Sequence, residues 1–132
     1  MAEVVVHGSA AGFTQEVIAG SHVFTVDEPS PSPYDLLLAA LGSCTSMTLG
    51  IYARRKAWPL ESVTVRLRSS RIHAVDCAEC ETKEGMLDRI ELDIELVGTL
   101  SVEQRSKLLE IANKCPVHRT LVSEINIRTR LV

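Results

Sequence analysis

The stretch PYDLLLAALGSCTSMTLGIYARRK, from Pro33 to Lys56, decides the fold of this 132-residue chain. Its start is well marked, because Ser32 suits an N-cap, Pro33 suits the first helical position and Asp35 suits the positive end of a helix dipole. Trp58-Pro59 marks its end, since the residue before a proline disfavours helical backbone. The first two turns have no polar face, which is typical of a helix buried on most sides. The pattern predicts one long, buried central helix.

A membrane-spanning helix is the alternative to a buried one. Residues 36–53 contain no charged side chain, and this length reaches the lower limit for a span. Glycine, serine and threonine dilute the stretch, however, and its flanks have the pattern of strands that need a covering partner. The N-terminus has neither the basic region nor the long apolar run of a secretion signal. We therefore expect a soluble, cytoplasmic protein without a membrane span.

The segments around the helix predict an α+β fold with antiparallel sheets. A capping box at Ser101 to Gln104 predicts a second helix to about Lys114, and Pro116 predicts a short third helix to about Val122. Since the central helix is too apolar for one chain to cover, we expect a tight homodimer; the length favours a single domain over residues 1–132. β-branched and alternating runs predict strands at Ala2–His7, Phe13–Ala19, His22–Val26, Ser62–Ile72, Met86–Val97 and Ile125–Val132.

The charge pattern excludes some classes of function. The net charge is −3, and all 14 lysines and arginines lie from Arg54 onward, so there is no overall electrostatic case for nucleic-acid binding. The chain also has no phosphate-binding loop and no dinucleotide fingerprint. We expect no cofactor.

Four cysteines in a cytoplasmic chain indicate redox chemistry or metal binding rather than structural disulfides. Cys44 and Cys115 lie far apart in sequence, in apolar segments, and each alone is explained as a small buried hydrophobe. As a pair they suit a peroxidatic thiol and its resolving partner. The helical neighbours of Cys44 carry no cation, so an activating charge would come from elsewhere in the fold or from a partner subunit. His118, one helical turn after Cys115, suits either tuning of that thiol or a capping role.

A second constellation lies in the loop between two expected strands. His73, Asp76, Cys77 and Cys80 bring four potential metal ligands into eight residues, and the Cys-x-x-Cys spacing allows two thiolates to share a metal or form a disulfide. The sequence has no second Cys-x-x-Cys pair, which a structural zinc site normally uses. Metal binding, a redox-active disulfide and no special role all remain open for this loop.

The residues PYDLLLAALGSC, from Pro33 to Cys44, together with Cys115-Pro116-Val117-His118, resemble the OsmC/Ohr family. The resemblance covers nearly the whole chain and implies an intertwined α+β homodimer with active sites at the subunit interface. It also implies that Cys44 is the peroxidatic and Cys115 the resolving cysteine in the reduction of small organic hydroperoxides. The reductant that it implies is a dithiol, notably a protein-bound lipoyl group.

The chain departs from the peroxidase members of that family at two places. Those members carry an arginine in the N-terminal strand region, whereas this chain has no cation before Arg54. They also carry a glutamate directly after the proline that opens the helix; here Tyr34 takes that place and Asp35 follows. Tyr34, Asp35 and His118 are therefore the candidates for supporting roles, and the chain resembles the OsmC-like branch more than Ohr proper.

Two functions follow from these observations. The first is a thiol-dependent hydroperoxide reductase that uses Cys44 and Cys115. The alternative is a non-enzymatic binding protein, which takes a small apolar ligand at the dimer interface or a metal at His73, Cys77 and Cys80.

Overall fold

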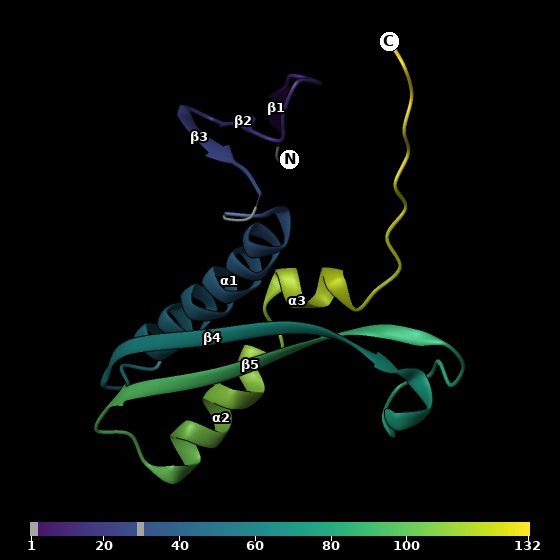
Figure 1. Cartoon of the computed structure of the whole chain (residues 1–132). Coiled ribbons are helices and arrows are strands. Elements are labelled where there is room, and N and C mark those ends of the chain that lie inside the picture. The colour runs from purple at the N-terminus through teal and green to yellow at the C-terminus, as the bar shows by residue number, and fades with distance from the viewer. Residues whose placement is uncertain (1–2, 29–30) are drawn as a thin grey trace. The chain divides into compact units, whose positions relative to one another are not determined.

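The structure, a computed structural model, describes residues 3–28 and 31–132 (Figure 1). Contacts within the chain divide it into two compact units, Met1–Ala39 and Ala40–Val132. Strands and helices follow one another as an α+β chain with antiparallel sheets, as the sequence predicts. The expectation of a single domain over residues 1–132 stays a prediction.

The first unit contains a three-stranded antiparallel sheet in the order β1-β2-β3. Its strands are β1 (Val4–Gly8), β2 (Gln15–Ala19) and β3 (His22–Val26), in the places that the sequence predicts. Gly20, with φ of 61°, occupies the tight turn between β2 and β3, where a left-handed backbone favours glycine. Ala2, with which the first predicted strand begins, lies outside the described residues.

Helix α1 (Pro33–Arg55) begins in the first unit and continues into the second. A reciprocal cap starts it: the Asp35 N–H donates to Ser32 Oγ at 3.2 Å, and the Ser32 N–H donates to the Asp35 carboxylate at 2.9 Å. Two bonds close its other end, from the Ala57 N–H to the Arg54 carbonyl and from the Trp58 N–H to the Ala53 carbonyl. These are the two hydrogen bonds of a Schellman motif, and they place Ala57 at a φ of 57°.

The second unit contains a long antiparallel ribbon of β4 (Leu60–His73) and β5 (Met86–Gly98), with α2 (Val102–Ala112) and α3 (Pro116–Leu121) (Figure 1). The capping box expected at Ser101 and Gln104 is present at the start of α2. Helices α1 and α2 pack on the apolar face of the ribbon, which includes Val63 and Leu96. The buried centre of this core consists of Leu49, Ala53, Leu108 and Ala112.

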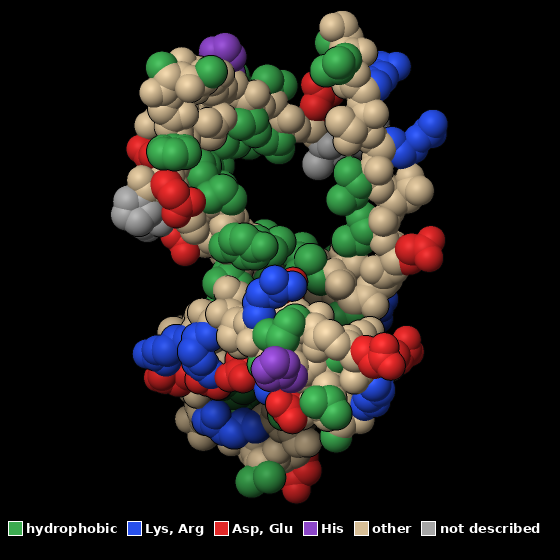
Figure 2. Space-filling model, turned by 45° about the vertical axis from the view of Figure 1, so that its right-hand side comes forward, with side chains coloured by type: hydrophobic (Ala, Val, Ile, Leu, Met, Phe, Trp, Pro, Cys, Tyr) green, Lys and Arg blue, Asp and Glu red, His purple; other side chains and the backbone are tan. Residues whose placement is uncertain are grey.

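The opposite face of the ribbon is charged and solvated. Arg68 donates to Asp93 at 2.8 Å and to Glu91 at 3.1 Å. The hydrogen bond from Arg68 to Asp93, and then its positive charge, lower the pKa of Asp93. Arg66 with Glu95 is a further exposed pair on this face. Figure 2 shows basic and acidic side chains close together on the visible surface. Exposed pairs of this kind contribute little to stability, so the face mainly keeps the ribbon solvated.

The strand expected at Ile125–Val132 is absent. In the part of the chain that the structure describes, this segment pairs with neither sheet and belongs to no helix or strand (Figure 1). Ile127 is 83% exposed and Leu131 is fully exposed. The alternation of apolar and polar residues is that of a strand, but a strand also needs a neighbour for its backbone hydrogen bonds.

By length and composition alone, α1 could cross a membrane, with a mean hydropathy of 1.6 over its most apolar window. The core helix of a soluble protein meets the same criterion. Leu49 and Ala53 of α1 are buried against α2 in the second unit. These contacts favour a core helix.

The Schellman motif generates a prediction about glycine. We expect Ala57→Gly to raise the free energy of unfolding by about 0.5–1 kcal/mol, because glycine adopts a positive φ without the steric cost that alanine bears. The matched control is Ala39→Gly inside α1. We expect this substitution to lower the free energy of unfolding by about 1 kcal/mol. Urea denaturation of both variants measures the two effects, and a loss of stability at position 57 would contradict the assignment of this motif.

Candidate functional site

Cys44 lies at the edge of the buried face of α1. Leu41, Thr45 and Leu49 on this helix are buried, whereas Cys44 is half-buried. Met47 is 67% exposed and Ile51 is 46% exposed, and both lie on the same side of the helix as Cys44 because they follow it at a spacing of three and seven residues. The thiol thus lies between the core and a stripe of exposed apolar side chains on α1.

Cys115 lies at the start of α3, where it is the N-cap residue. Its sulfur accepts a hydrogen bond from the His118 N–H at 3.3 Å, and Pro116 occupies the first helical position, where its missing N–H costs nothing. The side chain is fully buried. The expected short helix after Cys115 is therefore present, and it fixes the sulfur in the core.

The fold brings the two cysteine-bearing segments into contact. Thr45, the residue after Cys44, has its Oγ1 atom 3.8 Å from the sulfur of Cys115, although 70 residues separate them in sequence. The Thr45 hydroxyl also donates to the Leu41 carbonyl at 2.8 Å, which fixes its rotamer. Cys44 and Cys115 are both free thiols. Sequence reasoning missed Thr45; its only signal was a hydroxyl beside a cysteine in an apolar helix.

The Cys44 side chain makes no hydrogen bond and no ion pair within residues 3–28 and 31–132. Of the three supporting candidates, Tyr34 is 64% exposed and Asp35 takes part in the cap of α1. His118 contributes only its backbone N–H to the sulfur of Cys115, so a role for its side chain stays a prediction.

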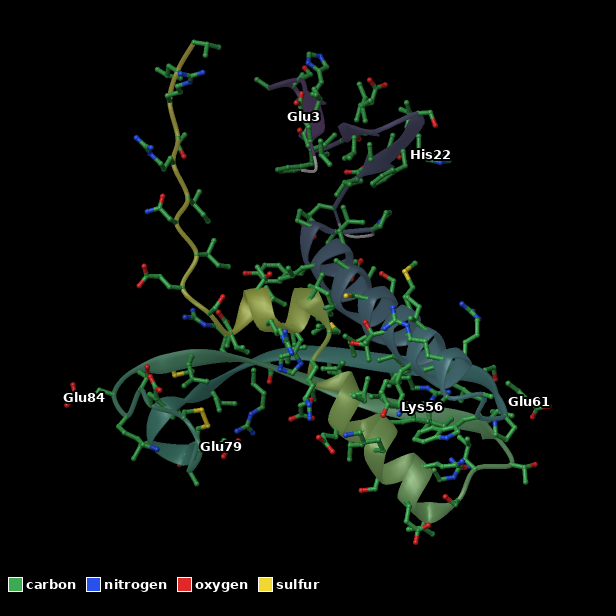
Figure 3. The ribbon with its side chains drawn as sticks, turned by 180° about the vertical axis from the view of Figure 1, so that it is seen from behind. Glu3, His22, Lys56, Glu61, Glu79 and Glu84 are labelled. Carbon is green, nitrogen blue, oxygen red and sulfur yellow. A yellow bond between two sulfur atoms is a disulfide. The ribbon has the colours of Figure 1, made fainter. Side chains whose placement is uncertain are left out.

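The loop between β4 and β5 contains a disulfide between Cys77 and Cys80 (Figure 3). A short 3-10 helix, η1 (Ala74–Asp76), precedes it and includes Asp76, while His73 is the last residue of β4. No three His, Cys, Asp or Glu side chains gather in a metal-binding arrangement within the described ranges. The structure thus joins the two cysteines to each other and does not assemble His73, Asp76, Cys77 and Cys80 as a metal site.

A small apolar hollow lies beside the core of the second unit, with a volume of about 230 Å³. Arg105 lies on its wall, and the guanidinium donates to the carbonyls of Leu96 and Gly98 at 3.2 and 3.1 Å. The other lining residues are Leu49, Ile94, Leu96, Leu108 and Leu109. A volume of about 230 Å³ is below the roughly 300–1,000 Å³ of most ligand sites, so the hollow has room only for a very small apolar molecule.

The sequence matches the family model described as OsmC-like protein over residues 26–130. The chain belongs to the OsmC-like protein family. The matched residues include the helix with Cys44, Cys115 and the two cysteines of the loop. None of the curated proteins matches the sequence.

Solved structures of OsmC-like and Ohr proteins share the fold of this OsmC-like chain. An OsmC-like protein from Mycoplasma pneumoniae aligns with a TM-score of 0.73 at 19% identity, over 92% of this chain and 86% of that one. The organic hydroperoxide resistance protein OhrB of Bacillus subtilis aligns with a TM-score of 0.62 at 17% identity, over 92% and 90% of the two chains. An organic hydroperoxide resistance protein OsmC from Legionella pneumophila gives 0.66 at 17%, over 92% and 89%. At these identities the likeness shows the fold alone.

The contact between Thr45 and Cys115 generates a prediction about stability. We expect Thr45→Val to lower the free energy of unfolding of the reduced protein by about 1 kcal/mol, because the valine keeps the volume but removes the buried hydroxyl and its bonds. Thr48→Val is the matched control, since Thr48 is only half-buried on the same helix and its hydroxyl makes no hydrogen bond among the described residues. Equal losses in the two variants, measured by urea denaturation, would show that the hydroxyl contact contributes nothing.

Proposed function

We propose that this OsmC-like protein is a thiol-dependent reductase of organic hydroperoxides, with Cys44 as the peroxidatic and Cys115 as the resolving cysteine. The observation that supports it most is the 3.8 Å contact between the Thr45 hydroxyl and the sulfur of Cys115. This contact brings a buried free thiol to the segment that holds a second, half-buried one. A disulfide-forming catalytic cycle requires two cysteine-bearing segments that folding brings together.

The exposure of the two sulfurs fits these roles. In the first step the Cys44 thiolate attacks the outer oxygen of the peroxide, the O–O bond breaks, and the alkoxide takes a proton and leaves as an alcohol. In the second step Cys115 attacks the sulfur of the Cys44 sulfenic acid, a disulfide forms, and the oxygen leaves as water. Cys44 is the more exposed of the two, so it meets the substrate first, whereas Cys115 is shielded until a sulfenic acid forms beside it. A dithiol, for which we propose a lipoyl-type group, then reduces the disulfide in the cytoplasm.

We propose that the protein works as a homodimer that covers the exposed stripe of α1. Met47 and Ile51 lie on this stripe beside Cys44, and large side chains so exposed on one helix face are typical of an interaction surface. The apolar residues of the unpaired segment at Ile125–Val132 add further uncovered surface. A second copy would bury the stripe and enclose Cys44 in an apolar site, which suits an organic rather than an inorganic peroxide.

The catalytic roles predict different results for the two cysteines. We expect Cys44→Ser to lower the rate of cumene hydroperoxide consumption with dihydrolipoamide by at least about a hundredfold, because the nucleophile is lost. Cys115→Ser should still react once with peroxide and accumulate a sulfenic acid at Cys44, which dimedone traps and mass spectrometry detects. The double variant Cys77→Ser/Cys80→Ser is the matched control and should keep the wild-type rate.

Wild-type turnover no faster than that of Cys44→Ser would contradict the reductase proposal. Binding of a small apolar ligand in the hollow next to Arg105 would then be the better-supported function, since that cavity does not depend on thiol chemistry.

The dimer proposal predicts that a charge on the stripe separates the subunits. We expect Met47→Glu to shift the mass measured by light scattering from that of two chains to that of one, because a buried carboxylate without a partner is costly. Ser106→Glu is the control, since it adds the same charge at an exposed position of α2. A wild-type protein with the mass of a single chain would refute the dimer directly.

A further inference from the structure

We infer that Cys77 and Cys80 form a second dithiol–disulfide centre, separate from Cys44 and Cys115, which exchanges with small uncharged thiols at the sulfur of Cys80. The bond closes a loop across a sequence separation of only three residues, with the two Cα atoms 5.4 Å apart. A cross-link over so short a loop removes little entropy from the unfolded chain, so it is a weak structural staple. The disulfide therefore needs another explanation than stability.

The two sulfurs lie in unequal surroundings. Cys77 is only 2% exposed, and its N–H donates to the carbonyl of the fully buried Ala74 at 3.1 Å. Cys80 is half-buried, and its neighbours Glu79 and Glu81 are exposed. Figure 3 shows Glu79 beside the disulfide in this loop. An incoming thiolate therefore reaches Cys80, and Cys77 is the leaving group.

Lys83 provides the positive charge that such a leaving group needs. Its ammonium donates to the carbonyl of Cys77 at 2.8 Å and to the carbonyl of Ala78 at 3.2 Å, so the charge is held at the backbone of the residue whose sulfur leaves. A nearby cation favours a thiolate over a thiol. The Ala74 N–H, which donates to the Gly85 carbonyl at 2.8 Å, closes the loop without help from the sulfurs, so the frame can persist when the disulfide opens.

The charge of the loop selects the thiol that reacts. Residues 76–84 contain four exposed carboxylates and Lys83 as their one cation, so the loop is negative. The thiolate of glutathione carries more negative charge than that of an uncharged thiol, so the loop repels glutathione more strongly. The acidic residues are Asp76, Glu79, Glu81 and Glu84.

The exchange balances as follows. A thiolate of an uncharged dithiol attacks the sulfur of Cys80, the bond between the two protein sulfurs breaks, and Cys77 leaves as a thiolate and takes a proton. The second thiol of the reagent then attacks the mixed disulfide, which releases Cys80 and closes the reagent into a cyclic disulfide. The loop gains two electrons and two protons, and the dithiol loses them.

The test uses the full chain with Cys44→Ser and Cys115→Ser, so that Cys77 and Cys80 are the only cysteines whose thiols are counted. We expect dithiothreitol to reduce the pair while circular dichroism shows a folded protein, with thiols counted by alkylation and mass spectrometry. Opening only after denaturant unfolds the chain would overturn the inference, because the disulfide would then be an inaccessible structural bond. This outcome is independent of peroxidase activity.

Single-cysteine variants identify the attacked sulfur. In the same background, the variant that retains Cys80 should react with a chromogenic aromatic disulfide about tenfold faster than the variant that retains Cys77. Equal or reversed rates would refute attack at Cys80.

Two matched comparisons test the charges. Lys83→Gln should slow reduction by dithiothreitol about threefold or more, whereas Lys83→Arg should keep the wild-type rate. At equal thiolate concentration, 2-mercaptoethanol should react faster than the anionic 2-mercaptoethanesulfonate, and added salt should narrow the difference. No effect of Lys83→Gln, or equal rates of the two thiols, would overturn the role assigned to these charges.

Discussion

The second unit depends on the burial of one face of α1 between the β4–β5 ribbon and α2. Leu49 and Ala53 meet Leu108 and Ala112 there. Gly42 allows α1 to lie close to β4, since a Cβ atom at that position would lie 2.7 Å from Cδ1 of Leu67. Adjacent residues of a helix point about 100° apart, so a residue next to a buried one points away from the core. Cys44 directly precedes the buried Thr45. Cys44 is half-buried for this reason.

Local rules predicted most of the elements, because their causes are local. The cap at Ser32 and Asp35, the capping box at Ser101 and the alternation in β4 and β5 each act within a few residues. The segment Ile125–Val132 shows the limit of this reasoning. Its alternation suits a strand, but whether a strand forms depends on a partner that no local pattern specifies.

The candidate site was predictable in its residues but not in its contacts. Cys44 and Cys115 are candidates that the sequence alone supplies, and their catalytic roles stay a prediction. The contact of Cys115 with Thr45 arises from packing between α1 and the start of α3, which has no sequence signature. The Cys-x-x-Cys spacing fitted both a metal and a disulfide, because two thiols at that spacing satisfy either, and only the placement of further ligands distinguishes them.

The two cysteine pairs differ in how they depend on folding. Cys77 and Cys80 have a sequence separation of three, so a local turn is enough to bring their sulfurs together, even in a chain still being synthesised. Cys115 reaches Thr45 across 70 residues, a contact that needs the ribbon and α2 in place. An oxidant that met the chain before it folded would therefore find this local pair first, whereas the contact of Cys115 with Thr45 would form only when the core was complete. In an unfinished chain, disulfide formation between Cys77 and Cys80 would thus compete with wrong disulfides between distant cysteines.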